Sequence, residues 1–136
     1  MIRCFMICDS NGFPFYSRIL DQKYSNIDDS VFSGFISAIG NIGKKLFNEE
    51  IATITFGLGK FNIIVVAKEL VTEKRSIYFV FIVEGSCNQK SMKRFSTEIF
   101  IDTKQLLKNP KMENQDMVNK VDNIIDTKFG GLQYCD

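Results

Sequence analysis

Residue types that commonly carry out chemistry are sparse in this 136-residue chain. It contains no histidine, which excludes Ser-His-Asp and Cys-His catalysis and histidine ligands to a metal ion. The serines and lysines form no recognisable nucleophile motif. The sequence therefore predicts a protein that is not an enzyme and that has no catalytic residue, metal site or cofactor.

The motif Gly57-Leu58-Gly59-Lys60 resembles the end of a phosphate-binding loop. Such a loop needs another glycine five residues before the Gly-Lys pair, then Ser or Thr and the start of a helix. Here Ile54 stands at the first position and Phe61 follows Lys60, at the start of an apolar run. We therefore interpret this motif as the turn between two strands.

Carboxylates and cysteines are the remaining candidates for chemistry. Asp28-Asp29 and Glu49-Glu50 are neighbours in sequence, and neighbours on a helix diverge by about 100°, so neither pair can easily share a metal ion. Cys4 and Cys8 lie on one predicted strand, roughly 13 Å apart, which is too far for a disulfide. No Cys-x-x-Cys motif is present. We expect reduced thiols in a cytoplasmic protein.

Charge and hydropathy exclude two further classes of partner. The net charge is +1, which does not indicate a nucleic-acid-binding surface. No apolar run approaches the roughly 20 residues of a membrane helix. Lys90, Lys93 and Arg94 form a small basic cluster on a predicted helix. We interpret this cluster as a solvated face, with peripheral contact to lipid headgroups as the most that it could support.

The hydrophobic pattern predicts one domain over residues 1–136, with a core of about 1–129 and a short tail at 130–136. Strands are expected at residues 2–8, 13–20, 51–56, 61–68 and 77–84, with a charged loop at 69–76. Helices are expected at about 29–48, at 86–108 (as one helix or broken near Asp102) and at 115–128. Asn109-Pro110 and Gly130-Gly131 are the predicted helix stops.

The order of these elements is β-β-α-β-β-β-α-α, and short turns between the strands indicate a mostly antiparallel, five-stranded sheet. The runs at 61–68 and 77–84 are apolar throughout, which is typical of strands covered on both faces. One helix on one face and two on the other would cover them. The sequence therefore predicts an α+β fold, built as an α-β-α sandwich.

That order, together with two segments, resembles the longin domain family, which is related to roadblock-type domains. The segments are the polar turn and strand DSNGFPF at residues 9–15 and the small-residue-rich helix SVFSGFISAIGNIGKKLF at 30–47. The similarity covers about residues 1–129. In longin domains the fifth strand is central in the sheet, and the uniformly apolar segment 77–84 would hold that place here.

The resemblance implies a non-enzymatic protein-interaction module of small-GTPase and vesicle-traffic machinery, of archaeal or eukaryotic type. Because the chain stops at Asp136 without heptads or a GTPase domain, it implies a stand-alone subunit of the adaptor, tether or exchange-factor kind. The expected partner is a small GTPase or another longin or roadblock-type subunit, with a homodimer as one form. The alternative is a small-molecule sensor of PAS or profilin type, which would need a cavity.

Two surfaces are the candidates for partner binding. On the first helix, Phe32, Phe35, Ile36, Ile39, Ile42 and Leu46 recur at three- and four-residue steps, so we expect them to face the core. The opposite face would then point outward with unusually small residues, which would let another backbone approach closely; it comprises Ser33, Ser37, Gly40 and Lys44. The second surface is the edge strand at 13–20, with Phe13, Tyr16 and Arg18 as candidate contacts.

Overall fold

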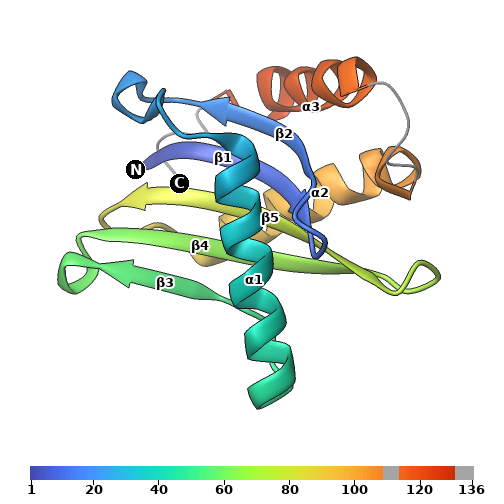
Figure 1. Ribbon diagram of the computed structural model, residues 1–136. Helices are drawn as coiled ribbons and strands as arrows, with labels where there is room; N and C mark the ends of the chain where they lie inside the picture. Colours follow the sequence, from blue (N-terminus) through green and yellow to red (C-terminus); the bar gives the residue numbers. More distant parts are fainter. Residues whose placement is uncertain (109–113, 131–136) are drawn as a thin grey trace.

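Five strands form one antiparallel sheet in the computed structural model, which describes residues 1–108 and 114–130 (Figure 1). The order across the sheet is β2-β1-β5-β4-β3, so that the uniformly apolar fifth strand is central, as predicted. The strands are β1 (Ile2–Asp9), β2 (Pro14–Ile19), β3 (Thr53–Phe56), β4 (Phe61–Leu70) and β5 (Arg75–Glu84).

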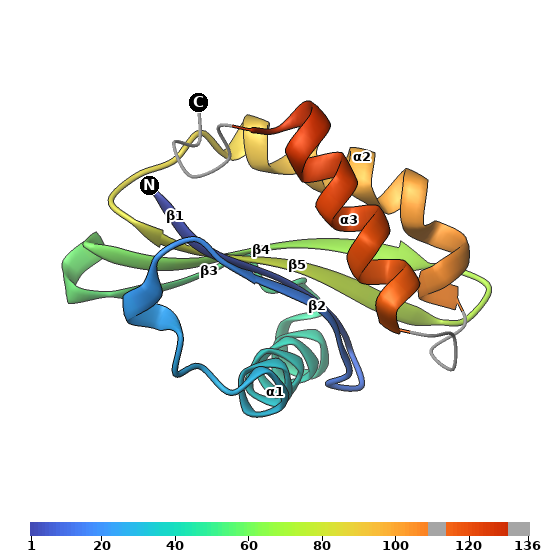
Figure 2. The same cartoon turned by 90° about the horizontal axis from the view of Figure 1, so that it is seen from above.

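The helices cover both faces of this sheet. Helix α1 (Asp29–Phe47) lies on one face, and α2 (Gln89–Lys108) and α3 (Asn114–Lys128) lie on the other (Figure 2). The predicted α+β class and the predicted layering are therefore confirmed. Two short 3₁₀ segments, η1 (Gln22–Tyr24) and η2 (Gly57–Gly59), lie in connections. The predicted helix stop at Asn109-Pro110, Gly131 and the tail after it lie outside the described residues.

The hairpin between β4 and β5 is longer than predicted, because the two strands together take up half of the expected loop at 69–76. Glu69 pairs with Ser76, and Leu70 pairs with Arg75. Leu70 is fully buried, so apolar burial holds the strand ends together despite the surrounding charges. Lys74 closes the short turn with a φ of +52°.

Helix α2 is continuous, so the predicted alternative of a break near Asp102 is wrong. It begins at Gln89 rather than at residue 86. The Asn88 side chain explains this start, since its Oδ1 accepts a hydrogen bond from the backbone N–H of Lys90 at 2.9 Å. An asparagine that satisfies a free N–H group in this way is a typical helix N-cap.

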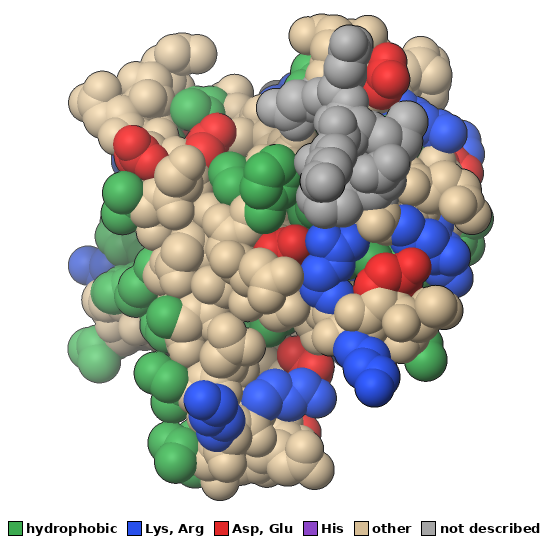
Figure 3. Space-filling model, turned by 45° about the vertical axis from the view of Figure 1, so that its right-hand side comes forward, with side chains coloured by type: hydrophobic (Ala, Val, Ile, Leu, Met, Phe, Trp, Pro, Cys, Tyr) green, Lys and Arg blue, Asp and Glu red, His purple; other side chains and the backbone are tan. Residues whose placement is uncertain are grey.

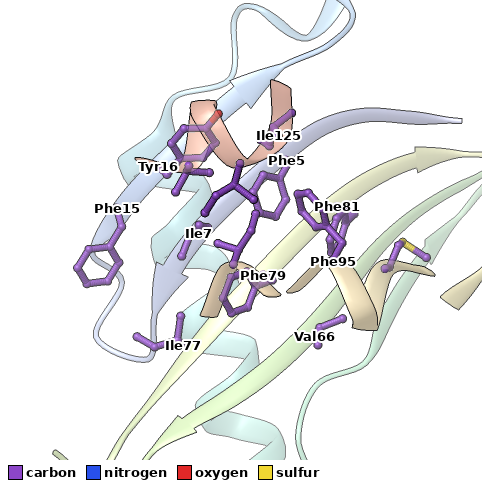
Figure 4. Close-up of a cluster of buried hydrophobic side chains, with 14 of the residues drawn as sticks. Phe5, Ile7, Phe15, Tyr16, Val66, Ile77, Phe79, Phe81, Phe95 and Ile125 are labelled. Carbon is purple, nitrogen blue, oxygen red and sulfur yellow. The ribbon is translucent and has the colours of Figure 1, made fainter. Parts of the chain in front are cut away.

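The larger core lies between the sheet and the pair α2 and α3, and aromatic rings fill its centre (Figure 4). Phe5 on β1 packs against Phe81 on β5 and Phe95 on α2, with ring centroids 5.0 Å apart in both pairs. All three rings are fully buried. Burial of aromatic side chains on this scale accounts for a large share of the stability of a domain of this size.

The core under α1 is smaller. Its buried side chains are Met6, Cys8, Ile36, Ile63, Val65, Tyr78 and Val80. Among the residues of α1, all of which the structure describes, Ile36 is the one large apolar side chain that is buried. Phe32, which is half-buried, packs against the same core, so α1 contributes less apolar surface to the domain than α2 or α3 does.

Asp9, at the end of β1, is a buried carboxylate beside the turn to β2. Its Oδ1 accepts hydrogen bonds from the backbone N–H groups of Asn11 and Phe13, both at 3.0 Å. Its Oδ2 lies 3.0 Å from Arg75 Nη1, and Arg75 Nη2 donates to the carbonyl of Leu107 on α2. This ion pair thus joins the first hairpin, the start of β5 and the end of α2.

Glu84, the last residue of β5, is the centre of a second charged cluster. Lys23 Nζ lies 2.6 Å from its Oε1, and the Tyr24 hydroxyl donates to the same oxygen at 2.9 Å. Arg3 Nη2 lies 3.2 Å from its Oε2. The hydrogen bond from Lys23, followed by that from Tyr24, lowers the pKa of Glu84 from 4.5 to about 2.

This lowered pKa predicts an acid-sensitive contribution to stability. The folded state favours ionised Glu84, so its contribution is present above about pH 4.5 and is lost as the pH falls toward about 2. We expect the stability advantage of the native chain over Glu84→Gln to be constant at neutral pH and to shrink through that window. Urea unfolding at a series of pH values would measure it, and parallel stability curves for the two proteins would contradict the expectation.

Candidate functional site

Helix α1 is defined by polar groups at both ends. The Asp28 side chain accepts a hydrogen bond from the backbone N–H of Val31 at 2.9 Å, so Asp28 is the N-cap of the helix. Asn48 ends the helix with a left-handed backbone (φ +54°), a conformation that asparagine tolerates. The caps fix where the helix begins and ends, but they do not fix which face meets the sheet.

The small-residue face of α1 points inward, so the prediction that it faces solvent is wrong. Ser33, Ser37 and Gly40 are all buried. Ser33 Oγ donates a hydrogen bond to the carbonyl of Gly12, in the turn after β1, at 2.7 Å. A Cβ atom at Gly40 would lie 2.5 Å from the Tyr78 hydroxyl. None of these three residues is accessible to a partner.

The small-residue face of α1 points inward because it lets the helix pack at a short distance from the sheet. Glycine and serine let the α1 backbone approach the sheet and the first turn more closely than a row of Phe and Ile would. Lys44 is the one member of the predicted set that stays exposed, and its Nζ lies 3.0 Å from Glu50 Oε1. The close approach that the small residues permit is thus used within the chain.

Large apolar side chains occupy the outside of α1 instead. Val31, Phe35, Ile42 and Leu46 are 70%, 42%, 55% and 69% exposed, and Ala38 between them is also exposed. Their steps of three and four residues place these five residues, here called the outer stripe, along one side of the helix. The prediction that Phe35, Ile42 and Leu46 face the core is therefore wrong.

The outer stripe belongs to a wider apolar surface. In the space-filling view, hydrophobic side chains run down the left side of the molecule, and Lys or Arg side chains lie near the lower end (Figure 3). Phe47, at the end of α1, is also exposed. Contiguous exposed apolar residues of this size mark interaction sites more often than single exposed side chains do.

The edge strand β2 does not offer the predicted contacts. Tyr16 is buried, and its hydroxyl donates to Asp122 Oδ1 on α3 at 2.5 Å. Arg18 Nη2 lies 2.9 Å from Asp126 Oδ1 on the same helix. Helix α3 thus occupies both side chains, and of the three predicted residues only Phe13 presents a largely exposed apolar ring. Sequence patterns do not indicate these contacts, because more than one hundred residues separate the partners.

The opposite edge carries an apolar turn. The predicted turn at Gly57–Gly59 is confirmed, and Leu58 at its tip has a left-handed backbone (φ +56°) and a fully exposed side chain. Phe56 and Phe61, on either side, are also exposed. The C-terminal end of α1 extends past β3 at this edge of the sheet (Figure 1).

One open surface groove of about 250 Å³ is mainly apolar and lies on the α1 side of the sheet. It is lined by Tyr24, Phe56, Phe61, Asn62, Ile63 and Ile82. Such a groove does not enclose a ligand on most sides, as small-molecule sites usually do. It therefore does not favour the alternative of a small-molecule sensor.

Nucleophilic and metal-ligating groups form no site in the part of the chain that the structure describes. Residues 1–108 and 114–130 contain no group of three metal-ligating side chains. Cys4 and Cys8 are free and buried, and burial raises the pKa of their thiols to about 11 and about 12. Both thiols therefore stay protonated and unreactive at neutral pH. Cys87 is disulfide-bonded, so the expectation of reduced thiols throughout is wrong at that position.

Lys90, Lys93 and Arg94 are exposed at the start of α2. Arg94 Nε lies 3.5 Å from Glu98 Oε1, one helical turn further on.

Among the described helices, none combines the length and the hydropathy needed to cross a membrane. A scan against models of known protein families found no match to this chain, and a search of curated proteins found none either.

Proposed function

We propose that this protein is a non-catalytic protein-interaction module that binds its partner through the outer stripe of α1. The observation that carries the proposal is the orientation of α1. Its small residues pack inward, while Val31, Phe35, Ile42 and Leu46 remain exposed on a regular, capped helix. Exposing these side chains costs free energy that a partner would recover by covering them.

The resemblance to longin domains extends this proposal to a class of machinery. The chain would serve as an adaptor, tether or exchange-factor subunit in a small-GTPase or vesicle-traffic assembly in the cytoplasm. Its partner there would be a small GTPase or another longin or roadblock-type subunit. In that compartment the disulfide at Cys87 would be exposed to reduction.

The test compares two glutamate substitutions at exposed isoleucines. Ile42 is 55% exposed on α1, and Ile101 is 67% exposed on α2. We expect Ile42→Glu to weaken partner binding at least about tenfold, because it places a charge inside the apolar docking surface. Ile101→Glu is the matched control and should bind as the native chain does.

Each immobilised protein would be incubated with a panel of purified small GTPases in both nucleotide states and with extract of the source organism. Partners retained by the native chain and by Ile101→Glu, and lost from a folded Ile42→Glu, support the outer stripe. Retention of every partner by Ile42→Glu would exclude this surface. If none of the partners is a GTPase or belongs to a traffic assembly, that part of the proposal fails.

A further inference from the structure

The outer stripe has a symmetric spacing. Val31 and Leu46 lie equally far from the midpoint between residues 38 and 39, and so do Phe35 and Ile42. If two copies of α1 pack antiparallel about that midpoint, Val31 faces Leu46 of the partner subunit and Phe35 faces Ile42 of the partner subunit. The stripe is then complementary to itself, which a two-fold interface requires.

The helix ends also suit an antiparallel pair. Asp28 and Asp29 lie at the start of α1, and Lys45 lies in its last turn, where Lys44 is already paired with Glu50. An antiparallel pair brings the start of each helix near the Lys45 end of the other, and the two helix dipoles oppose each other favourably. Lys45 forms no ion pair within the described part of the chain and is therefore available to the partner.

The centre of the stripe is small, and this also fits a helix pair. Ala38 is exposed and stands next to the proposed two-fold axis. A methyl group there lets two helix axes approach to about 8 Å, the close end of the usual range. The longer side chains on either side would then pack into the spaces beside it.

The exposed area is sufficient for a specific but weak complex. The large side chains of the stripe together expose on the order of 500 Å², at the upper end for an apolar patch on a monomer. Two copies would thus bury on the order of 1,000 Å², about the least that a specific interface buries.

We infer that a second copy of this chain covers the outer stripe, in a face-to-face dimer whose centre is an antiparallel pair of α1 helices. The two sheets then lie outside and the two helices between them. The inference rests on the proposed function, since it uses the same surface, and it names the occupant of that surface.

Complementary substitutions at positions that face each other test the register. We expect Phe35→Glu and Ile42→Lys each to shift the molar mass, measured by light scattering, from dimer to monomer at concentrations where the native chain is dimeric. An equimolar mixture should regain the dimer, because one contact becomes an ion pair and the other stays native. Ile101→Glu should remain dimeric. A mixture that stays monomeric while the native chain dimerises would overturn the antiparallel register.

Cysteine cross-linking tests the position of the axis. Ala38→Cys should form a covalent dimer with itself under mild oxidation, above the level given by the native cysteines. Val31→Cys alone should not exceed that level, whereas a mixture of Val31→Cys with Leu46→Cys should. Cross-linking of Val31→Cys alone as efficient as that of Ala38→Cys would overturn the inference.

A monomeric native chain at high micromolar concentration would overturn the dimer without deciding the proposed function. If Ile42→Glu then still loses partners that Ile101→Glu keeps, a different protein covers the stripe and the proposed function stands. If the monomer instead floats with phosphatidylcholine–phosphatidylserine vesicles, and Ile42→Glu does not, lipid covers the stripe and both proposals fail.

Discussion

Replacement of Asp9 by alanine is expected to lower the free energy of unfolding by about 3–5 kcal/mol, the range for breaking one partner out of a buried ion pair. The side chains of Asp9 and Arg75 are only 2% and 10% exposed. Removal of the carboxylate leaves the guanidinium buried without its counter-charge. It also removes the acceptor for the N–H groups of Asn11 and Phe13, which hold the first turn.

Urea unfolding of Asp9→Ala, Arg75→Met and the double variant would measure this effect. We expect the double variant to be more stable than Asp9→Ala, because it leaves no buried charge without a partner. Asp9→Asn, which keeps an acceptor for the turn, should fall between Asp9→Ala and the native chain. A loss of less than about 1 kcal/mol in Asp9→Ala would mean that the pair contributes no more than a surface ion pair does.

The second large effect concerns Gly34 and Gly40, two glycines of helix α1, for which opposite results are expected. Gly40→Ala should destabilise the protein by about 1–3 kcal/mol, as overpacking of a filled site does. Its new methyl group would lie 2.5 Å from the hydroxyl of Tyr78, a buried side chain. Gly34→Ala should stabilise the protein by up to about 1 kcal/mol, because nothing lies within 4 Å of its Cβ position and alanine favours the helix.

Thermal unfolding of both variants distinguishes the inward packing of α1 from an outward one. Tyr78→Phe removes the clashing oxygen, so it should recover part of the stability lost in Gly40→Ala. If Gly40→Ala stabilises the protein as much as Gly34→Ala does, then Gly40 does not lie against the sheet. Ser33 and Ser37 would in that case be exposed as well.

The strands were predictable because contiguous apolar runs with turn residues between them leave few alternatives. The uniformly apolar sequence of β5 predicts a strand covered on both faces, and its two buried faces agree; its central place was an implication of the resemblance to longin domains. The end of the β4–β5 hairpin was not predictable. Its charged sequence indicates a loop, whereas Arg75 is held by Asp9, which lies 66 residues earlier in the chain.

The orientation of α1 was mispredicted for a different reason. Apolar residues occupy about half of the helix circumference, from Val31 and Phe35 at one side of the arc to Ile36 near the other, so part of them must be exposed whichever side packs. Hydrophobic periodicity finds the middle of that arc, but it does not account for how closely the backbone can approach the sheet. The small residues supply that information, because they are the ones that a close approach requires.

The light attachment of α1 has a consequence for how a partner would be recognised. Its apolar attachment consists of Ile36, which is buried, and Phe32, which packs half-buried against the same core. Polar contacts to the first turn add to it, such as that from Ser33 to Gly12 and that from Asn41 to the carbonyl of Ser10. An element with less apolar burial than the other two helices is among those whose local opening costs least free energy. Binding on its outer side would suppress that opening, so the folding of α1 and the association with a partner form one coupled equilibrium.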